Sequence, residues 1–437
     1  MQEVSATQEP GVGAVDESPL VQNRPYVLLW VAQGLTQTAQ NGIFFVLMVF
    51  ITEATGSTTH LSLLVFSTIL PSVVFGLAAG VVVDRHSKRM ILVVTNVMRT
   101  VLVVGYLAAG DVLPLVYGVN LLFSSASQFF APAEVASIAL LVPRSQLMRA
   151  NSLFNLTFTG SQFAGLVFPI PVFVKLFGTY WTLVGLAVAY AVGTALVSLL
   201  PKDQTSAPAN EAGGFLSGLW EEWKMGWRHI RGKPIISFAM LNMTTATTLI
   251  LVLSVVSGPF VKRVLGIRAD DAVYILAPAG IGVGLGALLS PRLARLVPSP
   301  RLISSGLLAF SVCLVAFGSI SWIGRNITAG VPEAIVVQWL LGLVIPLAFV
   351  MGVAFAFMTI PAQTVLQEHS PPSLRGKIFA TQLTLGNVAS IFPVLFVAGL
   401  ADLFGIAQVI ALVGVAVLAI GIFTLRAYGA RLLGGSA

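Results

Sequence analysis

The decapeptide Gly80-Val81-Val82-Val83-Asp84-Arg85-His86-Ser87-Lys88-Arg89 decides how the rest of this chain is interpreted. It separates two apolar segments, residues 61–83 and 90–109, each about long enough to cross a bilayer. Its second half carries a carboxylate and several permanent cations, and each such charge would cost at least a few kcal/mol in hydrocarbon. The decapeptide is therefore predicted to be a turn at a membrane surface, between two spanning helices.

The composition of the whole chain points to the same environment. The 437 residues are 56% hydrophobic and only 9% charged, with a mean hydropathy of +0.91. Soluble domains carry about 25% charged residues, so a multi-pass membrane protein is the class that fits. The net charge of +7 lies in short loops, which is typical of topology determinants and argues against nucleic-acid binding. With a single cysteine, Cys313, no internal disulfide or thiolate metal site is expected.

Twelve apolar segments follow one another with short polar breaks, in two sets of six, and predict an all-α membrane protein. The predicted spans are 26–51, 61–83, 90–109, 113–138, 151–173, 178–200, 235–261, 271–291, 302–322, 334–360, 377–400 and 405–427. The predicted parts are a disordered cytoplasmic tail, two six-helix bundles joined by a cytoplasmic linker, and a second tail, over residues 1–24, 25–200, 201–233, 234–427 and 428–437.

The distribution of basic residues predicts the orientation of the protein in the membrane, because Lys and Arg accumulate on the cytoplasmic side of membrane proteins. If the decapeptide is cytoplasmic, all but five of the 24 Lys and Arg residues fall on that face. The exceptions are Lys175, Lys262, Arg263, Arg268 and Arg325. Both termini are therefore expected in the cytoplasm, and we expect a monomer in the bilayer.

The linker has a second half with an amphipathic pattern. Trp220, Trp223 and Trp227 share one helical face, with charged residues mostly opposite. This pattern predicts a helix lying in the headgroup layer, with a calmodulin-type peptide target as the alternative.

The decapeptide and its flanks resemble the signature loop of the major facilitator superfamily, in which Gly80, Asp84, Arg85, Lys88 and Arg89 match the family pattern and Ser87 replaces a glycine. Later segments, Pro132–Asn151 and Leu374–Ala380, resemble the bacterial macrolide and siderophore exporter branch. The resemblance implies two pseudo-symmetric six-helix bundles around a central cavity.

Rows of uncharged polar residues follow one face of several predicted spans. They are Gln33, Gln37 and Asn41; Asn120, Ser124 and Gln128; Asn155 and Thr159; Asn242 and Thr245; and Gln382 and Asn387. Single residues of this kind are commonly hydrogen-bonded between helices, which is the alternative interpretation. The resemblance implies that these spans line or adjoin the cavity, so we expect the rows to contact the substrate. Amides and hydroxyls without fixed charge suit a hydrophobic or amphiphilic cargo.

Charged residues near the cytoplasmic face are interpreted as a gate. The resemblance implies that Asp84 closes against the start of the eleventh helix, near Arg375, with Arg85 as relay and Glu134 as partner. Arg99, about two turns into the third span, is a second candidate to meet Glu134. The alternative is that these charges only set the topology of the loops.

The sequence therefore predicts a secondary transporter of the bacterial cytoplasmic membrane that exports hydrophobic or amphiphilic molecules by alternating access. Neither an enzyme motif, a metal site nor a phosphate-binding loop is present, and no cofactor is expected. Proton coupling is implied by the resemblance alone, with Glu134 and Glu53 as weak candidate carriers. The alternatives are a dedicated exporter or flippase of one amphiphile, such as a siderophore or lysophospholipid, and a non-transporting sensor or scaffold.

Overall fold

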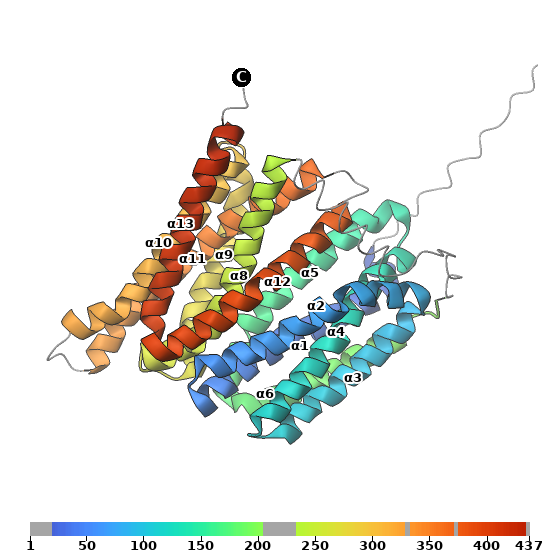
Figure 1. Ribbon diagram of the computed structural model, residues 1–437. Helices are drawn as coiled ribbons and strands as arrows, with labels where there is room; N and C mark the ends of the chain where they lie inside the picture. The colour runs from blue at the N-terminus through green and yellow to red at the C-terminus, as the bar shows by residue number, and fades with distance from the viewer. Residues whose placement is uncertain (1–19, 204–232, 328–332, 371–374, 434–437) are drawn as a thin grey trace, which may run out of the picture.

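The computed structural model describes residues 20–203, 233–327, 333–370 and 375–433, and the long elements in these ranges are α-helices (Figure 1). The first six are α1 (Arg24–Thr55), α2 (Thr58–Arg85), α3 (Lys88–Ala109), α4 (Leu113–Leu141), α5 (Leu147–Leu166) and α6 (Ile170–Ser198). The second six are α8 (Pro234–Arg263), α9 (Val273–Leu293), α10 (Ser299–Ile327), α11 (Glu333–His369), α12 (Arg375–Phe404) and α13 (Ile406–Leu433). A short 3₁₀ helix, η3 (Ala269–Ala272), precedes α9.

The two sets of six helices repeat one packing pattern. In the first set α4 packs against α2 and α3, α1 packs against α5 and α6, and α3 packs against α6. In the second set α11 packs against α9 and α10, α8 packs against α12 and α13, and α10 packs against α13. Each pair in the second set corresponds by order to one in the first, so the chain contains two copies of the same bundle, which lie side by side in Figure 1.

The membrane-spanning character is clear for most of these helices. Ten of the described helices are long and apolar enough to cross a membrane, and α4 and α5 are not among them. Both α4 and α5 carry rows of amides and hydroxyls, which lower their hydropathy. The all-α multi-pass fold is confirmed, while the count of twelve spans stays a prediction.

Several helices begin or end at other residues than the hydropathy pattern predicted. Helix α5 ends at Leu166 and α6 begins at Ile170, whereas the prediction placed the break after residue 173. A non-helical residue, Gly178 with φ 79°, interrupts α6 near the predicted start of that span. At 32 residues, α1 is about 48 Å long and exceeds a hydrocarbon core of about 30 Å, so hydropathy marks only its middle.

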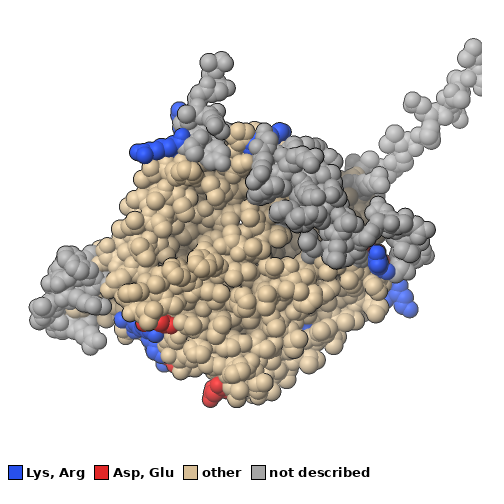
Figure 2. All heavy atoms as spheres, viewed as in Figure 1, with Lys and Arg blue, Asp and Glu red and all other residues tan. Residues whose placement is uncertain are grey.

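Charged side chains gather at the two ends of the helices. Figure 2 shows a broad face without Lys, Arg, Asp or Glu, bordered by charged residues at its edges. This is the surface expected where lipid tails contact a protein. The predicted headgroup-layer helix with Trp220, Trp223 and Trp227 lies outside the described residues.

Candidate functional site

One end of the molecule holds a carboxylate that joins the two halves. Asp402, near the end of α12, accepts hydrogen bonds from Ser57 Oγ (2.8 Å) and Thr59 Oγ1 (2.7 Å). It also accepts from the backbone N–H groups of Thr58 (3.0 Å) and Thr59 (2.9 Å). Ser57 is the N-cap of α2, so the C-terminal half supplies an anion to the positive end of a helix in the N-terminal half.

A cation from α8 completes this network. Arg263 Nη1 lies 3.1 Å from Asp402 Oδ1, and Arg263 Nη2 donates to the backbone carbonyl of Gly56. Gly56 ends α1 with φ 62°, a conformation that favours glycine and that turns the chain directly into α2. We call Ser57, Thr58, Thr59, Arg263 and Asp402 the outer latch, after the predicted orientation in which the decapeptide faces the cytoplasm.

Two ion pairs cross between the halves at this end. Lys262 Nζ lies 3.2 Å from Glu53 Oε2, and Lys175 Nζ lies 2.5 Å from Asp271 Oδ1. Lys175 also donates to Tyr274 Oη at 3.0 Å. Single exposed pairs contribute about 0–1 kcal/mol, so the several bonds to Asp402 are expected to dominate the contact.

The outer latch lies far from the decapeptide. Helix α2 begins at Thr58, in the latch, and ends at Arg85, in the decapeptide. Its 28 residues span about 42 Å, so the two features occupy opposite faces of a bilayer. The ion pairs of Lys175 and Lys262 cross the halves at the latch end, as do the hydrogen bonds of Asp402 and Arg263 to the turn between α1 and α2, so these contacts join the halves on the face opposite the decapeptide.

The decapeptide itself is bound to its own half. Asp84 and Arg85 are exposed, and Gly80 is half-buried in α2. Ser87 caps α3 and donates its hydroxyl to Asp203, which also accepts from the backbone N–H groups of Lys88 (2.6 Å) and Arg89 (3.4 Å). The replacement of the family's glycine by Ser87 thus adds a cap and a bond to the segment after α6.

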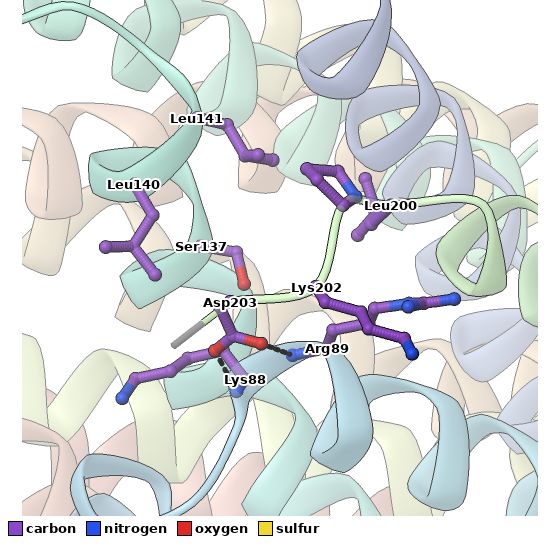
Figure 3. Close-up of a pocket in the computed structure, with 9 residues that line it drawn as sticks. Lys88, Arg89, Ser137, Leu140, Leu141, Leu200, Lys202 and Asp203 are labelled. Atoms are coloured by element: carbon purple, nitrogen blue, oxygen red, sulfur yellow. Dashed lines mark hydrogen bonds between the residues drawn. The ribbon is translucent and has the colours of Figure 1, made fainter. Parts of the chain in front are cut away.

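Asp203 also lines a pocket of about 310 Å³ between the start of α3, the end of α4 and the segment after α6 (Figure 3). The lining residues are Lys88, Arg89, Ser137, Leu140, Leu141, Leu200, Pro201, Lys202 and Asp203. Arg89 extends from the decapeptide to the carbonyl of Ser198, and Lys88 Nζ lies 3.4 Å from the carbonyl of Asp84. These bonds fix the base of the decapeptide while its acidic side chain remains exposed.

Asp203 is expected to stabilise this junction in a pH-dependent manner. Burial alone would raise the pKa of Asp203, but hydrogen bonds from Ser87 and from the Lys88 and Arg89 backbone outweigh it and lower the pKa. A carboxylate with a lowered pKa stabilises the folded state above its ordinary pKa of about 3.9, and this contribution is lost as pH falls.

The substitution Asp203→Ala should speed hydrogen exchange in the first turn of α3 at neutral pH. The loss of a helix cap lowers the free energy of local opening by about 0.5–2 kcal/mol. Lys202→Ala, in the same pocket, should leave that exchange unchanged; equal rates in both variants would contradict the capping role.

The two buried gate candidates lie inside the N-terminal bundle. Arg99 in α3 and Glu134 in α4 are 1% and 5% exposed. The guanidinium of Arg99 lies over the ring of Phe130, 3.9 Å from its centroid. Phe130 precedes Glu134 by one helical turn on α4, so Arg99 lies near Glu134, whereas Arg85 is exposed. Arg375 begins α12, and its side chain lies outside the described residues.

The polar rows are largely satisfied by nearby backbone. Within single helices, side chains bond to a carbonyl four residues earlier: Asn41 to Gln37, Gln128 to Ser124, Thr159 to Asn155, Asn242 to Phe238 and Thr245 to Leu241. Gln33, Ser124, Asn242 and Gln382 are buried, while Asn155 and Thr159 are exposed. Contact of these rows with a substrate stays a prediction.

Three members of the rows bridge between helices. Gln33 in α1 donates its Nε2 to the carbonyl of Phe154 in α5 at 3.1 Å. Asn120 accepts from Tyr106 Oη (3.0 Å) and donates to Ser67 Oγ (2.8 Å) and Thr68 Oγ1 (2.9 Å), so it braces α2, α3 and α4. Asn387 in α12 donates to Ser72 Oγ in α2 at 3.0 Å and crosses between the halves. For Asn120 these bonds favour the alternative interpretation, interhelical hydrogen bonding.

The sequence matches the family model described as the Major Facilitator Superfamily over residues 29–393. The chain belongs to this superfamily. As a superfamily member it is similar to the MFS-type transporter YfiS of Bacillus subtilis, 23% identical over 414 residues and 94% of each chain. It is 22% identical to the multidrug efflux pump Tap of Mycolicibacterium fortuitum, covering 87% of this chain and 90% of Tap.

The resemblance to macrolide exporters is also confirmed. Macrolide efflux protein A of Streptococcus pyogenes is 30% identical over 135 residues, which is 28% of this superfamily member and 32% of that protein. Among solved structures, the nucleoside transporter NupG matches with a TM-score of 0.65 at 12% identity, over 92% of this chain and 99% of that one. At this identity the structural likeness shows the fold alone.

Proposed function

We propose that this chain is a secondary active exporter of hydrophobic or amphiphilic small molecules, coupled to protons and working by alternating access in a bacterial cytoplasmic membrane. The observation that carries the proposal is the uneven joining of the two bundles. They are latched by Asp402 and Arg263 at one face, while Asp84 and Arg85 are exposed at the other. This is one end state of a transporter whose two halves close alternate faces around a site between them.

The type of cargo is supported by the chemistry of the spans and by the relatives. The polar rows offer amides and hydroxyls, and the buried charges of the described spans lie within the N-terminal bundle rather than between the halves. An anionic metabolite would need a fixed cation to bind it, typically an arginine. The relatives named for macrolide efflux and multidrug efflux support a hydrophobic or amphiphilic cargo and outward transport.

Uptake of labelled amphiphiles into inverted membrane vesicles tests the proposal. Vesicles containing the protein should accumulate several compounds of the panel when their interior is acidic, and a protonophore should abolish accumulation. Accumulation of one compound alone would indicate a dedicated exporter or flippase. Equal uptake in vesicles with and without the protein, across the panel, would contradict export.

Asp84 is expected to take part in closing the inner face. Asp84→Asn removes the charge and keeps the shape, so transport should fall about tenfold or more while expression stays normal, if a charge-assisted bond worth about 1.5–3 kcal/mol forms in the closed state. Asp111→Asn, an exposed carboxylate in the turn between α3 and α4, is the matched control. Full activity of Asp84→Asn would remove Asp84 from the mechanism.

A further inference from the structure

A cluster of ionisable side chains is buried in the N-terminal bundle, and neither latch nor polar rows account for it. Arg99 from α3, Glu134 from α4 and Tyr190 from α6 are 1%, 5% and 0% exposed. Helix α3 packs against both α4 and α6, and Arg99 contacts a ring from each: Phe130, one helical turn before Glu134 on α4, and Tyr190 on α6. Ionised groups at membrane depth are costly and are usually retained for a function.

The cation of this cluster is held mainly by aromatic faces. Arg99 Cζ lies 3.9 Å from the Phe130 ring centroid and 5.1 Å from that of Tyr190. Its Nη2 donates to Asn96 Oδ1, while its Nε is buried without a hydrogen-bond partner. Cation–π contacts are strongest with desolvated rings, so Phe130 and Tyr190 stabilise the charge of Arg99 whether or not a carboxylate neutralises it.

The carboxyl group of Glu134 is only partly satisfied. Its Oε1 is buried and has no hydrogen-bond partner, and no ion pair joins it to Arg99 within the part of the chain that the structure describes. A buried site favours the neutral acid, whereas the cation of Arg99, which lies over Phe130 one helical turn before Glu134 on α4, favours the carboxylate. A group placed between two opposing influences can change its protonation when one of them shifts slightly.

Other titratable groups on the surrounding helices are engaged elsewhere or exposed. From α1, Tyr26 faces the same apolar cluster as Phe130 and donates to the carbonyl of Ala150. The remaining groups are accounted for as follows: His60 contacts Tyr117, Tyr106 donates to Asn120, Lys88 donates to the carbonyl of Asp84 and Arg89 to that of Ser198, and Asp84, Arg85 and Arg149 are exposed. At the outer ends of the helices, Lys175 pairs with Asp271 and Glu53 with Lys262.

We propose that Glu134 is the group that binds and releases the coupling proton of this transporter, and that Arg99 is the positioning residue whose charge sets when it does so. The proposal rests on the proposed proton-coupled function. In the step itself a proton from water binds the Glu134 carboxylate, and the same proton later leaves to water. When Glu134 is protonated, only Phe130, Tyr190 and Asn96 stabilise the positive charge of Arg99. When Glu134 is ionised, its negative charge balances that of Arg99.

Proton binding at Glu134 would couple protonation to movement of the N-terminal bundle. Helix α3 begins in the decapeptide and α4 ends beside the pocket around Asp203. A change in the attraction between Arg99 and Glu134 acts on the contact between these two helices. The proton could thereby influence the decapeptide without lying in the substrate path.

Two transport assays separate coupling from folding. In proteoliposomes, Glu134→Gln should lose uptake driven by a pH gradient by about tenfold or more, while substrate counterflow at equal pH stays within about twofold of wild type. Glu134→Asp, which still titrates, should keep gradient-driven uptake with a shifted pH profile. Asp111→Asn should match wild type in both assays. Gradient-driven uptake at the wild-type level in Glu134→Gln would overturn the proposal.

Infrared difference spectroscopy gives a readout that needs no transport. A pH titration of wild type in lipid should show a carbonyl band of a protonated carboxylic acid that is missing in Glu134→Gln and present in Asp111→Asn. Arg99→Gln should move the midpoint of that band to higher pH, because removal of the cation favours the neutral acid. A Glu134 band without uptake of any cargo would contradict the proposed export and leave the proton site standing. Identical bands in wild type and Glu134→Gln would overturn the proton site.

Discussion

Replacing Gly352 with alanine should destabilise the C-terminal bundle more than other single-methyl changes in this chain. A Cβ on Gly352 in α11 would lie 1.9 Å from the carbonyl oxygen of Ala279 in α9. In the reverse direction, a Cβ on Gly282 in α9 would lie 2.1 Å from the carbonyl oxygen of Phe349. The two backbones are in direct contact, which is how small residues allow helices to associate in lipid.

The expected cost is that of overpacking. A backbone carbonyl cannot move aside like the end of a side chain, so α9 and α11 must separate, at about 1–3 kcal/mol for a single added methyl group. A gain in helix propensity of about 1 kcal/mol opposes this cost only partly. Gly352→Val should therefore lower the unfolding temperature in detergent more than Gly352→Ala does.

The same two helices provide matched controls. Nothing lies within 4 Å of a Cβ placed on Gly284 in α9 or Gly342 in α11. Gly284→Ala and Gly342→Ala should be neutral or slightly stabilising in the same thermal assay. If Gly352→Ala unfolded at the same temperature as these controls, the close contact of α9 and α11 would be refuted.

The architecture could be predicted from the sequence because its signals are local. Each spanning helix must satisfy its own backbone in lipid, so an apolar run of about 20 residues identifies it without knowledge of its neighbours. The decapeptide from Gly80 to Arg89 carries its own charges and a family pattern. The helix ends were misplaced for two reasons. Helix α1 extends beyond its apolar run because hydropathy reports the lipid-facing length, and the break between Leu166 and Ile170 lies inside an apolar run, where hydropathy gives no signal.

The outer latch was missed because its partners are far apart in the sequence. Asp402 lies in an apolar segment near the end of α12, more than 340 residues from Ser57 and Thr59. A signal was nevertheless present. Lys175, Lys262 and Arg263 lie on the face where basic residues are rare. Lys175 and Lys262 pair with acids across the halves, whereas Arg263 pairs with Asp402 of its own half and reaches the other half through the carbonyl of Gly56.

The polar rows show a different limit of prediction from the sequence. Helical periodicity correctly places Gln37 and Asn41 on one face, but it does not tell whether that face meets a cavity, a helix or the helix's own backbone. Asn41 bonds to the carbonyl of Gln37, and Asn120 bonds to two neighbouring helices. Arg99 and Glu134 lie near each other only because α3 and α4 pack together, which spacing in the sequence does not reveal.

Replacing Asp402 with alanine should shift the transporter toward the state that is open at the latch end. The substitution removes four hydrogen-bond acceptor contacts and the ion pair with Arg263, and it leaves that cation beside the α2 N-terminus without its anion. Charge-assisted hydrogen bonds contribute about 1.5–3 kcal/mol each, and every 1.4 kcal/mol lost changes a two-state population about tenfold. Asp402→Asn, which keeps one acceptor oxygen, should give a smaller shift, and Glu53→Gln a shift of at most about fivefold, because its ion pair is exposed.

Pulsed electron paramagnetic resonance can measure this shift in a Cys313→Ala background. Labels at Val112 and Leu403, exposed near the latch end in different halves, should move apart in Asp402→Ala. Labels at Met90 and Leu296, exposed at the opposite end, should approach each other, because alternating access closes one face when it opens the other. Unchanged distances at both ends in Asp402→Ala would show that the outer latch does not control the conformation. Movement at the latch end alone would show that the halves do not rock as rigid bodies, since rigid halves turning about a central site must carry both ends together.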